Sequence, residues 1–179
     1  MEDYHFDIAS YKKLKRIGKG GFGEVYQIQN TKTNEILAAK LSNFELESCS
    51  KEILYSLTRE VNILSRIAHA AVVRFVGYSP EWYDNLKCPV IVTEFYKNGS
   101  LLDIIELERL SRSHEAWNDT KKLINIYGIA AGMEYLHSHN IIHRDLKSGN
   151  VLIDNFLFPK LADFGFSNSY QQKESNDKV

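Results

Sequence analysis

The sequence has few of the residues that mark several whole classes of protein. Only two cysteines, Cys49 and Cys88, and three prolines occur in 179 residues. Two isolated cysteines exclude a disulfide framework and a thiolate metal site. No apolar run approaches the roughly 20 residues of a membrane span. The acidic start, Met1-Glu2-Asp3, lacks the basic and then apolar form of a signal peptide. We therefore expect a cytoplasmic protein that does not enter a membrane.

The sequence also lacks an excess of charge of either sign. Lys and Arg together number 22, Asp and Glu number 23, and the formal net charge is -1. This balance gives no electrostatic reason to expect nucleic acid or an anionic membrane as a partner. The hydrophobic content of 44% and the charged content of 25% are typical of a globular domain with a real core.

Strand patterns dominate the first half of the sequence and helical patterns the second half. Predicted strands lie within residues 11–41, 72–78 and 90–95. Predicted helices cover residues 51–68, 101–110 and 120–137. This order predicts an α+β protein with two segregated lobes.

The most informative segment is a polar window, residues 143–150, which reads His-Arg-Asp-Leu-Lys-Ser-Gly-Asn between two apolar segments. Asp163-Phe164-Gly165 begins thirteen positions after Asn150. Polar residues this dense would be costly to bury unless they bind something charged. An acid that accepts a proton, an amide and an acid that hold a hard cation, and a lysine for an anion together suit phosphoryl transfer.

On these residues the sequence resembles the eukaryotic protein kinases, with their H-R-D-L-x-x-x-N and D-F-G motifs. The resemblance implies a bilobal fold whose small lobe is an antiparallel sheet plus one helix. It also implies ATP and Mg²⁺ as cofactors and a protein hydroxyl as acceptor. Lys147 points to a serine/threonine kinase, and the run 147–150 is similar to the tyrosine-kinase-like group of these enzymes.

The resemblance also assigns roles to the polar residues. Asp145 would accept the proton of the acceptor hydroxyl, and Lys147 would neutralise charge on the transferred phosphoryl group. Asn150 and Asp163 would supply oxygen ligands to Mg²⁺. His143 would pack inside the protein, as part of an apolar column made of Leu64, Phe75, His143 and Phe164.

A glycine-rich segment, Gly18–Val25, fits the pattern G-x-G-x-x-G-x-V between two predicted strands. Glycines let a backbone approach phosphate oxygens closely, although a plain flexible hairpin would show the same pattern. A P-loop requires G-K-[ST], whereas Gly23 is followed by Glu24. A dinucleotide fold requires a helix after the glycines, whereas residues 25–28 favour a strand. Among nucleotide-binding loops, the kinase hairpin fits best.

Lys40 and Glu60 are predicted to form an ion pair. Lys40 ends an apolar strand, and Glu60 falls within the apolar stripe of the predicted helix. A buried carboxylate needs a partner, and Lys40 is the natural one, although a lone strand-end lysine would ordinarily reach solvent. In kinases such a pair holds the lysine against the α- and β-phosphates.

By resemblance, residues 90–96 lead into the hinge between the lobes, although the pattern alone would also fit a plain buried strand. Thr93 would gate the back of the adenine pocket, and the backbone of Glu94 and Tyr96 would meet the adenine edge. The other expected nucleotide-binding positions are Ile17, Gly18, Gly20, Gly23, Val25, Ala38 and Leu152.

The resemblance divides the chain into a lead-in (1–10), a small lobe (11–96), a partial large lobe (97–170) and a polar tail (171–179). The sequence ends fourteen residues after Gly165, before any A-P-E motif. We therefore expect an incomplete large lobe and a chain that binds nucleotide but transfers phosphate poorly. The alternative is an inactive nucleotide-binding or interaction fragment.

The predicted helix 120–137 is apolar over much of its surface. Its apolar positions are Leu123, Ile126, Tyr127, Ile129, Ala130, Met133 and Leu136. A helix of this kind is normally buried on several sides. We expect it to self-associate or to be covered by a partner chain, with Ile129 and Leu136 on the uncovered face.

Overall fold

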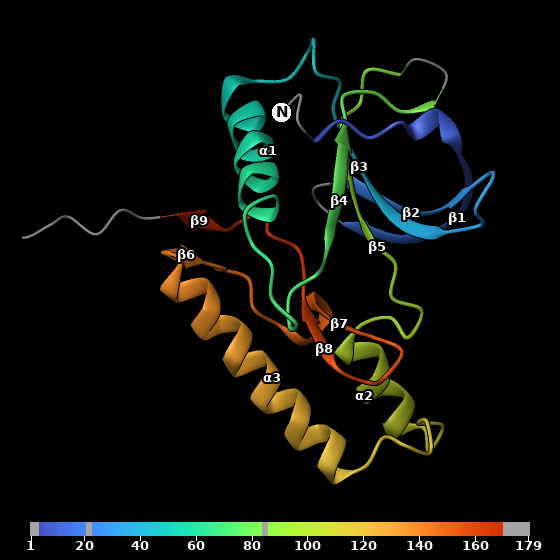
Figure 1. The fold of residues 1–179 in the computed structure, drawn as a ribbon, viewed down its shortest axis with the longest axis vertical. Coiled ribbons are helices and arrows are strands. Elements are labelled where there is room, and N and C mark those ends of the chain that lie inside the picture. Colours follow the sequence, from blue (N-terminus) through green and yellow to red (C-terminus); the bar gives the residue numbers. More distant parts are fainter. Residues whose placement is uncertain (1–3, 21–22, 84–85, 170–179) are drawn as a thin grey trace, which may run out of the picture.

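The computed structural model describes residues 4–20, 23–83 and 86–169, and Figure 1 shows them as two lobes. The first lobe holds an antiparallel sheet in the order β1-β2-β3-β5-β4, beside which α1 (Lys51–Leu64) lies. Its strands are β1 (Tyr11–Gly20), β2 (Gly23–Asn30), β3 (Ile36–Ser42), β4 (Phe75–Ser79) and β5 (Val90–Glu94).

The second lobe is mainly helical. Its helices are α2 (Leu101–Arg109) and α3 (Asp119–Ser138). Its strand pairs are β6 (Ile141–Ile142) with β9 (Asn168–Ser169) and β7 (Val151–Ile153) with β8 (Pro159–Leu161). Short 3-10 turns occur at Ile8–Ser10 and Ser148–Asn150. The predicted α+β class with two lobes is confirmed. Over the described ranges, no helix is both long and apolar enough to cross a membrane.

The local sequence explains where the helices begin. Ser50 precedes α1, and its hydroxyl accepts a hydrogen bond from the backbone N–H of Ile53. Ser100 and Asp103 form a reciprocal capping box at the start of α2. Asn118 caps α3 in the same way as Ser50 caps α1. Each cap satisfies backbone donors that a helix start leaves without partners.

One apolar cluster is shared by the two lobes. From the first lobe it includes Leu57, Val61 and Leu64 of α1, and from the second lobe it includes Leu161 and Phe164. The ring centroids of His143 and Phe164 are 4.9 Å apart, and Phe75 packs against the same cluster. The predicted burial of His143 beside Phe164 is confirmed. The shared core fixes the two lobes relative to each other.

Helix α3 packs on a different side from the one expected. Leu136 is fully buried and Ile129 packs against the core, so the expectation that they lie on an uncovered face is wrong. The physical reason is the stripe of Gly128 and Gly132. A Cβ at Gly132 would lie 2.8 Å from Leu161 Cδ1, and one at Gly128 would lie 2.7 Å from Pro159 Cγ. The glycines therefore let α3 approach β8 closely, and Leu136 continues their stripe.

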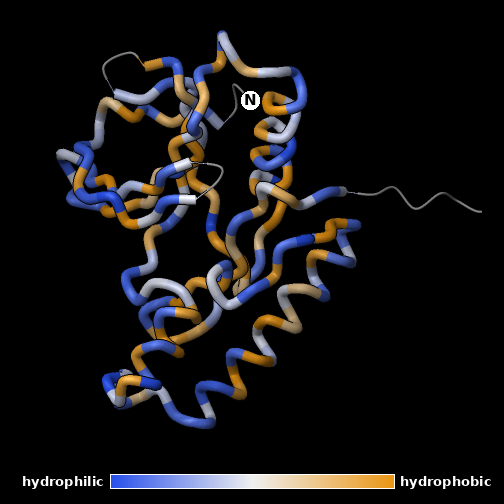
Figure 2. The backbone as a smooth tube through the Cα atoms, turned by 180° about the vertical axis from the view of Figure 1, so that it is seen from behind, coloured by the Kyte–Doolittle hydropathy of each residue, from blue (hydrophilic) through white to orange (hydrophobic). Residues whose placement is uncertain are grey.

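The exposed side of α3 carries other apolar residues. Leu123, Ile126 and Tyr127 are 66%, 66% and 75% exposed. Figure 2 shows apolar residues along the whole helix, with hydrophilic ones mainly towards its two ends. Because apolar residues occur all round α3, the hydrophobic pattern alone does not identify its packing side.

The described residues of the lead-in, 4–10, pack onto the sheet. His5 bridges in parallel to Tyr78, and the N–H of Phe6 donates to the Tyr78 carbonyl at 2.7 Å. Phe6 and Ile8 are buried. A Cβ at Gly77 would lie 2.9 Å from Phe6 Cβ, so the glycine makes room for this segment. The segment therefore covers the outer edge of β4, the last strand of the sheet.

Candidate active site

A cleft of about 880 Å³ lies between the lobes. Every residue that the sequence analysis assigned to a site lines this one cleft. They are Ile17, Gly18, Gly20, Gly23, Val25, Ala38, Lys40, Glu60, Thr93, Glu94, Tyr96, Asp145, Lys147, Asn150, Leu152 and Asp163. Gly21 and Phe22 of the glycine motif lie outside the described residues.

The glycine-rich segment forms one end of the β1–β2 hairpin. Gly18 pairs with Val25, and Gly20 pairs with Gly23. Gly23 has φ of 150°, and a Cβ there would lie 1.9 Å from the Leu41 carbonyl oxygen, so no other residue fits without a backbone shift. The segment continues into β2 and not into a helix. This geometry excludes the dinucleotide-binding arrangement.

The predicted pair between Lys40 and Glu60 forms. Lys40 Nζ lies 2.7 Å from Glu60 Oε1 and 2.9 Å from Asp163 Oδ1. Burial alone would lower the pKa of Lys40, but the two carboxylates outweigh it and the pKa is raised. The ammonium group is therefore charged at neutral pH. It joins β3, α1 and the D-F-G segment at a single point of the cleft.

The opposite wall carries a compact polar group. Asp145 Oδ2 accepts hydrogen bonds from Lys147 Nζ at 2.7 Å and from Asn150 Nδ2 at 2.8 Å. The Asn150 amide nitrogen also donates to the Asp145 carbonyl at 2.9 Å. The bond from Lys147, followed by that from Asn150, lowers the pKa of Asp145, so its carboxylate is ionised at neutral pH. Because these bonds use the nitrogen of the Asn150 amide, its oxygen is the atom suited to a cation.

His143 supports this wall from inside the protein. Its Nε2 lies 3.0 Å from the Ala162 carbonyl, which can only accept, so Nε2 carries the proton. Burial lowers the pKa of His143, and the ring is neutral at neutral pH. The buried hydroxyl of Ser167 donates to the His143 carbonyl at 3.1 Å. These bonds hold the polar loop against the segment that contains Asp163.

Asp163 adopts a strained backbone conformation. Its φ is 61°, in the left-handed region that non-glycine residues rarely occupy. Arg144 is similar, with φ of 67°. Such residues persist where the surrounding contacts hold them and are common at functional sites. In this case the conformation accompanies the bond from Lys40 Nζ to Asp163 Oδ1.

The apolar end of the cleft lies at the end of β5. Val25 and Ala38 line it from the first lobe, and Leu152 of β7 lines it from the second. The Glu94 side chain accepts hydrogen bonds from Arg74 Nε and from the Tyr96 hydroxyl, both at 3.3 Å. The Glu94 carboxylate is therefore committed to neighbouring side chains of this protein.

The sequence analysis missed several residues of the cleft. They include Lys15, Lys19, Val73, Lys97, Ser100 and Asp103. Lys15 and Lys19 lie two residues before and after Ile17, so strand alternation would have extended the prediction of Ile17 to both lysines, although the register of β1 is irregular between Lys13 and Gly18. The Ser100-x-x-Asp103 pattern predicts a helix start. It carries no signal that this start lies in the cleft.

Comparison with known proteins agrees with this geometry. The family described as "Protein kinase domain" matches residues 11–179. A nodulation receptor kinase of Pisum sativum is 35% identical over 98% of the chain, and the mitogen-activated protein kinase kinase kinase ANP1 of Arabidopsis thaliana is 35% identical over 88%. The serine/threonine-protein kinase SIK1 of Rattus norvegicus is 34% identical over 93%.

The chain spans only part of these relatives, with 18%, 23% and 20% of their respective lengths covered. The family match nevertheless extends over nearly the whole sequence and includes every residue of the cleft named above. The chain therefore belongs to the protein kinase family, among relatives that are serine/threonine kinases.

Proposed function

We propose that this chain binds ATP with Mg²⁺ in the cleft and transfers the γ-phosphate to a serine or threonine hydroxyl of a protein. One observation carries the proposal: the Lys40–Glu60 pair and the group of Asp145, Asn150 and Asp163 line the same cleft. Phosphoryl transfer depends mainly on positioning and electrostatics, which this arrangement supplies. The names of the relatives support the acceptor class.

The residues of the cleft fit the cofactors. Mg²⁺ prefers oxygen ligands and takes few from protein, and Asn150 and Asp163 offer an amide and a carboxylate. When bound, the cation neutralises charge on phosphate oxygens. Lys40 remains charged and would bind phosphate oxygens in place of its contact with Asp163. Glu60 would keep the lysine in position.

The polar residues on the wall opposite Lys40 would act on the acceptor hydroxyl. Asp145 is ionised at neutral pH and would orient the hydroxyl and take its proton. Lys147 Nζ lies 2.7 Å from Asp145 Oδ2, so its charge is close to the place where the phosphoryl group would be transferred. The hydrogen bonds of Asn150 hold the Asp145 carboxylate in one orientation.

We also propose that the exposed side of α3, formed by Leu123, Ile126 and Tyr127, meets a second copy of the chain or a partner chain. Apolar groups gathered on one surface commonly mark an interface. A cytosolic location is part of the proposal and agrees with the free thiols of Cys49 and Cys88.

Nucleotide binding tests the first half of the proposal. Calorimetric titration with ATP and Mg²⁺ should show weaker binding by Lys40→Met than by the wild type. The expected loss is about tenfold or more, because a charge-assisted phosphate contact contributes roughly 1.5–3 kcal/mol. Lys32→Met removes the same charge from an exposed turn and should leave the affinity unchanged. Equal affinities for all three proteins would contradict the proposal.

Phosphate transfer distinguishes an enzyme from a nucleotide-binding fragment without turnover. The purified chain should label serine or threonine of a protein substrate from γ-labelled ATP only slowly, as expected above, and Asp145→Asn should remove even this labelling. Binding of ATP without Asp145-dependent labelling would favour the fragment instead.

A further inference from the structure

The five-stranded sheet has two edges, β4 and β1, and only β4 is covered by another described segment. Residues 4–10 lie along β4. No strand of the described ranges lies beyond β1 (Figure 1). The Tyr83 hydroxyl donates to the carbonyl of Tyr11, at the start of β1, and from residue 12 onward the described backbone of the strand bonds only to β2. The outer side of β1 is therefore open over most of its length.

The open edge is strongly basic, although the whole chain is not. Residues 11–34, which form β1, β2 and the turn after them, contain six lysines or arginines and a single acidic residue, Glu24. Since the whole chain has a net charge of -1, the rest of it is net negative. Five of the six cations belong to β1 itself: Lys12, Lys13, Lys15, Arg16 and Lys19.

A single carboxylate serves the cations nearest the glycine-rich segment. Glu24 Oε1 lies 2.7 Å from Arg16 Nη1 and 3.5 Å from Lys19 Nζ. The other cations of β1 are exposed and form no ion pair with another described residue; they are Lys12, Lys13 and Lys15. An acidic group from outside would therefore meet these ammonium groups without displacing a carboxylate of the protein.

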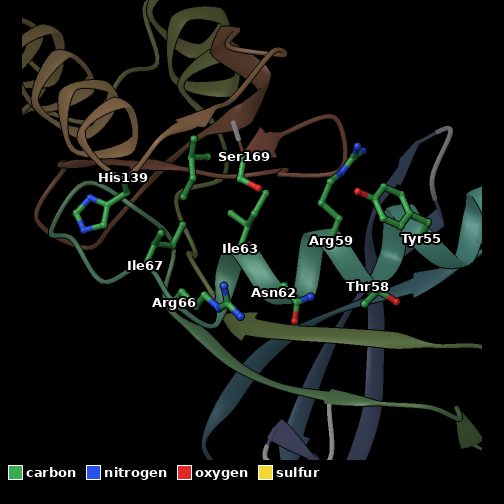
Figure 3. Close-up of a pocket in the computed structure, with 10 residues that line it drawn as sticks. Tyr55, Thr58, Arg59, Asn62, Ile63, Arg66, Ile67, His139 and Ser169 are labelled. Carbon is green, nitrogen blue, oxygen red and sulfur yellow. The ribbon is translucent and has the colours of Figure 1, made fainter. Parts of the chain in front are cut away.

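The basic residues of α1 differ in this respect. Arg59 and Arg66 line a cavity of about 330 Å³ between α1 and the β6–β9 pair (Figure 3). Arg59 donates to the Gly165 carbonyl at 3.4 Å, and its guanidinium carbon lies 5.8 Å from the centre of the Tyr55 ring. The first of these contacts joins α1 to the D-F-G segment, so Arg59 already has a role inside the protein.

The cations of β1 lie on both sides of the sheet. Val25 lines the cleft, so Tyr26, the next residue of β2, points away from it. Lys13 Nζ lies 4.8 Å from the centre of the Tyr26 ring and is therefore on the side away from the cleft. Lys15 lines the cleft, and Lys12 alternates with Lys13. A ligand that meets all these lysines must reach both sides of one strand.

This arrangement distinguishes between anionic ligands. A flat membrane surface would meet the cations of one side only. Single-stranded nucleic acid needs open aromatic faces for its bases, whereas Lys13 covers the ring of Tyr26 and the neighbouring Trp82 is 6% exposed. A second copy of the chain would bring the same cations to the edge, and like charges directly opposite one another are destabilising. An extended peptide beside the edge has side chains that alternate between the two sides.

We propose that the outer edge of β1, from Lys12 to Lys19, binds an extended acidic segment of a partner protein, with acidic side chains on both sides of the sheet. At about 3.3 Å per residue, a segment of about eight residues would cover this stretch. Leu14 and Ile17 are 37% and 40% exposed within it and would supply apolar contacts.

The charges of the edge would determine which segments bind. Lysines on an edge strand discourage pairing with other strands, and an acidic strand is the exception because its charges are opposite. The register of β1 is irregular between Lys13 and Gly18. Ion pairs between side chains, more than a continuous backbone ladder, would therefore hold the segment. The site does not depend on the proposed nucleotide binding.

The experiment uses the 179-residue chain without nucleotide and compares three fluorescent nonapeptides of threonine by anisotropy. The first has glutamates at positions two, three, five and six, which lie on both sides of an extended chain. The second has the same number of glutamates at positions two, four, six and eight, on one side only. The third has glutamines at the positions of the first. The first should bind about tenfold more tightly than the third, because several weak exposed ion pairs together reach about this factor, and more tightly than the second.

Two double variants separate a defined site from general charge attraction. Lys12→Gln/Lys15→Gln should weaken binding of the first peptide by about threefold or more. Arg109→Gln/Arg112→Gln removes the same charge from exposed positions of the second lobe and should leave the affinity unchanged. Thermal unfolding of both variants should match the wild type, because all four side chains are exposed. Equal affinity of the first peptide and either of the others, or equal losses in the two variants, would overturn the proposal.

Vesicles of phosphatidylserine test the membrane alternative. At physiological ionic strength the wild-type chain should stay in solution when the vesicles are sedimented. Sedimentation with the vesicles that Lys12→Gln/Lys15→Gln removes would mean that β1 meets a lipid surface, and would overturn the proposal. If the first peptide binds as expected while the chain binds no ATP, the edge site stands and the proposed function alone fails.

Discussion

The two walls of the cleft hold their charged groups in different ways. On the first wall, Lys40 and Glu60 are 20 residues apart and come from a strand and a helix. On the second wall, Asp145, Lys147 and Asn150 lie in one loop and bond to one another. The Glu60 side chain is 9% exposed, whereas that of Lys147 is 59% exposed. The first wall thus depends on the packing of α1, and the second depends on a few local bonds.

This difference predicts which substitutions affect folding and which affect only chemistry. A buried ion pair that loses one partner leaves a charge without compensation, which is costly. An exposed pair contributes little to stability, because water screens it. The second wall should therefore tolerate changes that destroy activity, whereas the first wall should not.

The largest effect is expected for Asp145→Asn. Loss of the proposed proton acceptor should lower the rate of phosphate transfer by about 100- to 10,000-fold. The free energy of unfolding should change little, because the bonds of Asp145 to Lys147 and Asn150 are local. Label transfer and urea unfolding measure the two quantities. If the variant loses its fold as well as its activity, the proposed difference between the two walls is wrong.

Substitutions in α3 extend the comparison to the packing beneath the second wall. Leu136→Ala should lower the free energy of unfolding by about 2–5 kcal/mol, because Leu136 is fully buried. Leu123→Ala, at a 66% exposed position, should change it by less than about 0.5 kcal/mol. Leu123→Ala should instead reduce self-association in sedimentation velocity. A similar loss of stability in both variants would mean that the side of α3 assigned to packing is wrong.

The sequence predicted the cleft better than it predicted α3. The cleft residues occur in short motifs at fixed spacing, and those motifs identify residues such as Lys40 and Asp145 whatever surrounds them. The packing side of α3 depends on segments distant in sequence, above all on β8. Apolar residues occur all round this helix and do not distinguish its sides.

Two glycines did carry that information. Glycine inside a helix costs about 1 kcal/mol relative to alanine, so its presence usually has a packing reason. Gly128 and Gly132, four residues apart, mark the side on which β8 approaches. The sequence analysis weighed the large apolar residues of α3 and overlooked these small ones.

Glu60→Gln tests the first wall more gently. Lys40 would keep Asp163 as a partner, so the free energy of unfolding should fall by only about 1–3 kcal/mol, and nucleotide binding should weaken. Glu24→Gln, which removes the pair with the half-exposed Arg16, is the matched control and should have little effect on stability. Thermal unfolding and calorimetry compare the two variants. Equal losses of stability would show that burial of Glu60 does not matter.

The smallest effect is expected from Lys147→Ala on the pH dependence of transfer. Lys147 is the main cause of the lowered pKa of Asp145, so its loss should raise that pKa. A base with a lowered pKa stays ionised as the pH falls until the pH reaches that pKa. The acidic limb of the pH–rate profile should therefore move to higher pH in the variant. Lys122→Ala, which breaks an ion pair with Glu108 away from the cleft, should leave the limb in place. An unmoved limb in Lys147→Ala would contradict the assignment of Asp145.

The segment before β1 has a consequence for how the molecule avoids misassembly. An edge strand with free backbone groups is a template for strands of other chains and a common start of aggregation. His5 and Phe6 occupy that position beside Tyr78 of β4. Gly77→Ala would push Phe6 away, and the main effect would be an unprotected edge. Residues 4–10 thus occupy a position on this edge at which a strand of another chain could otherwise pair.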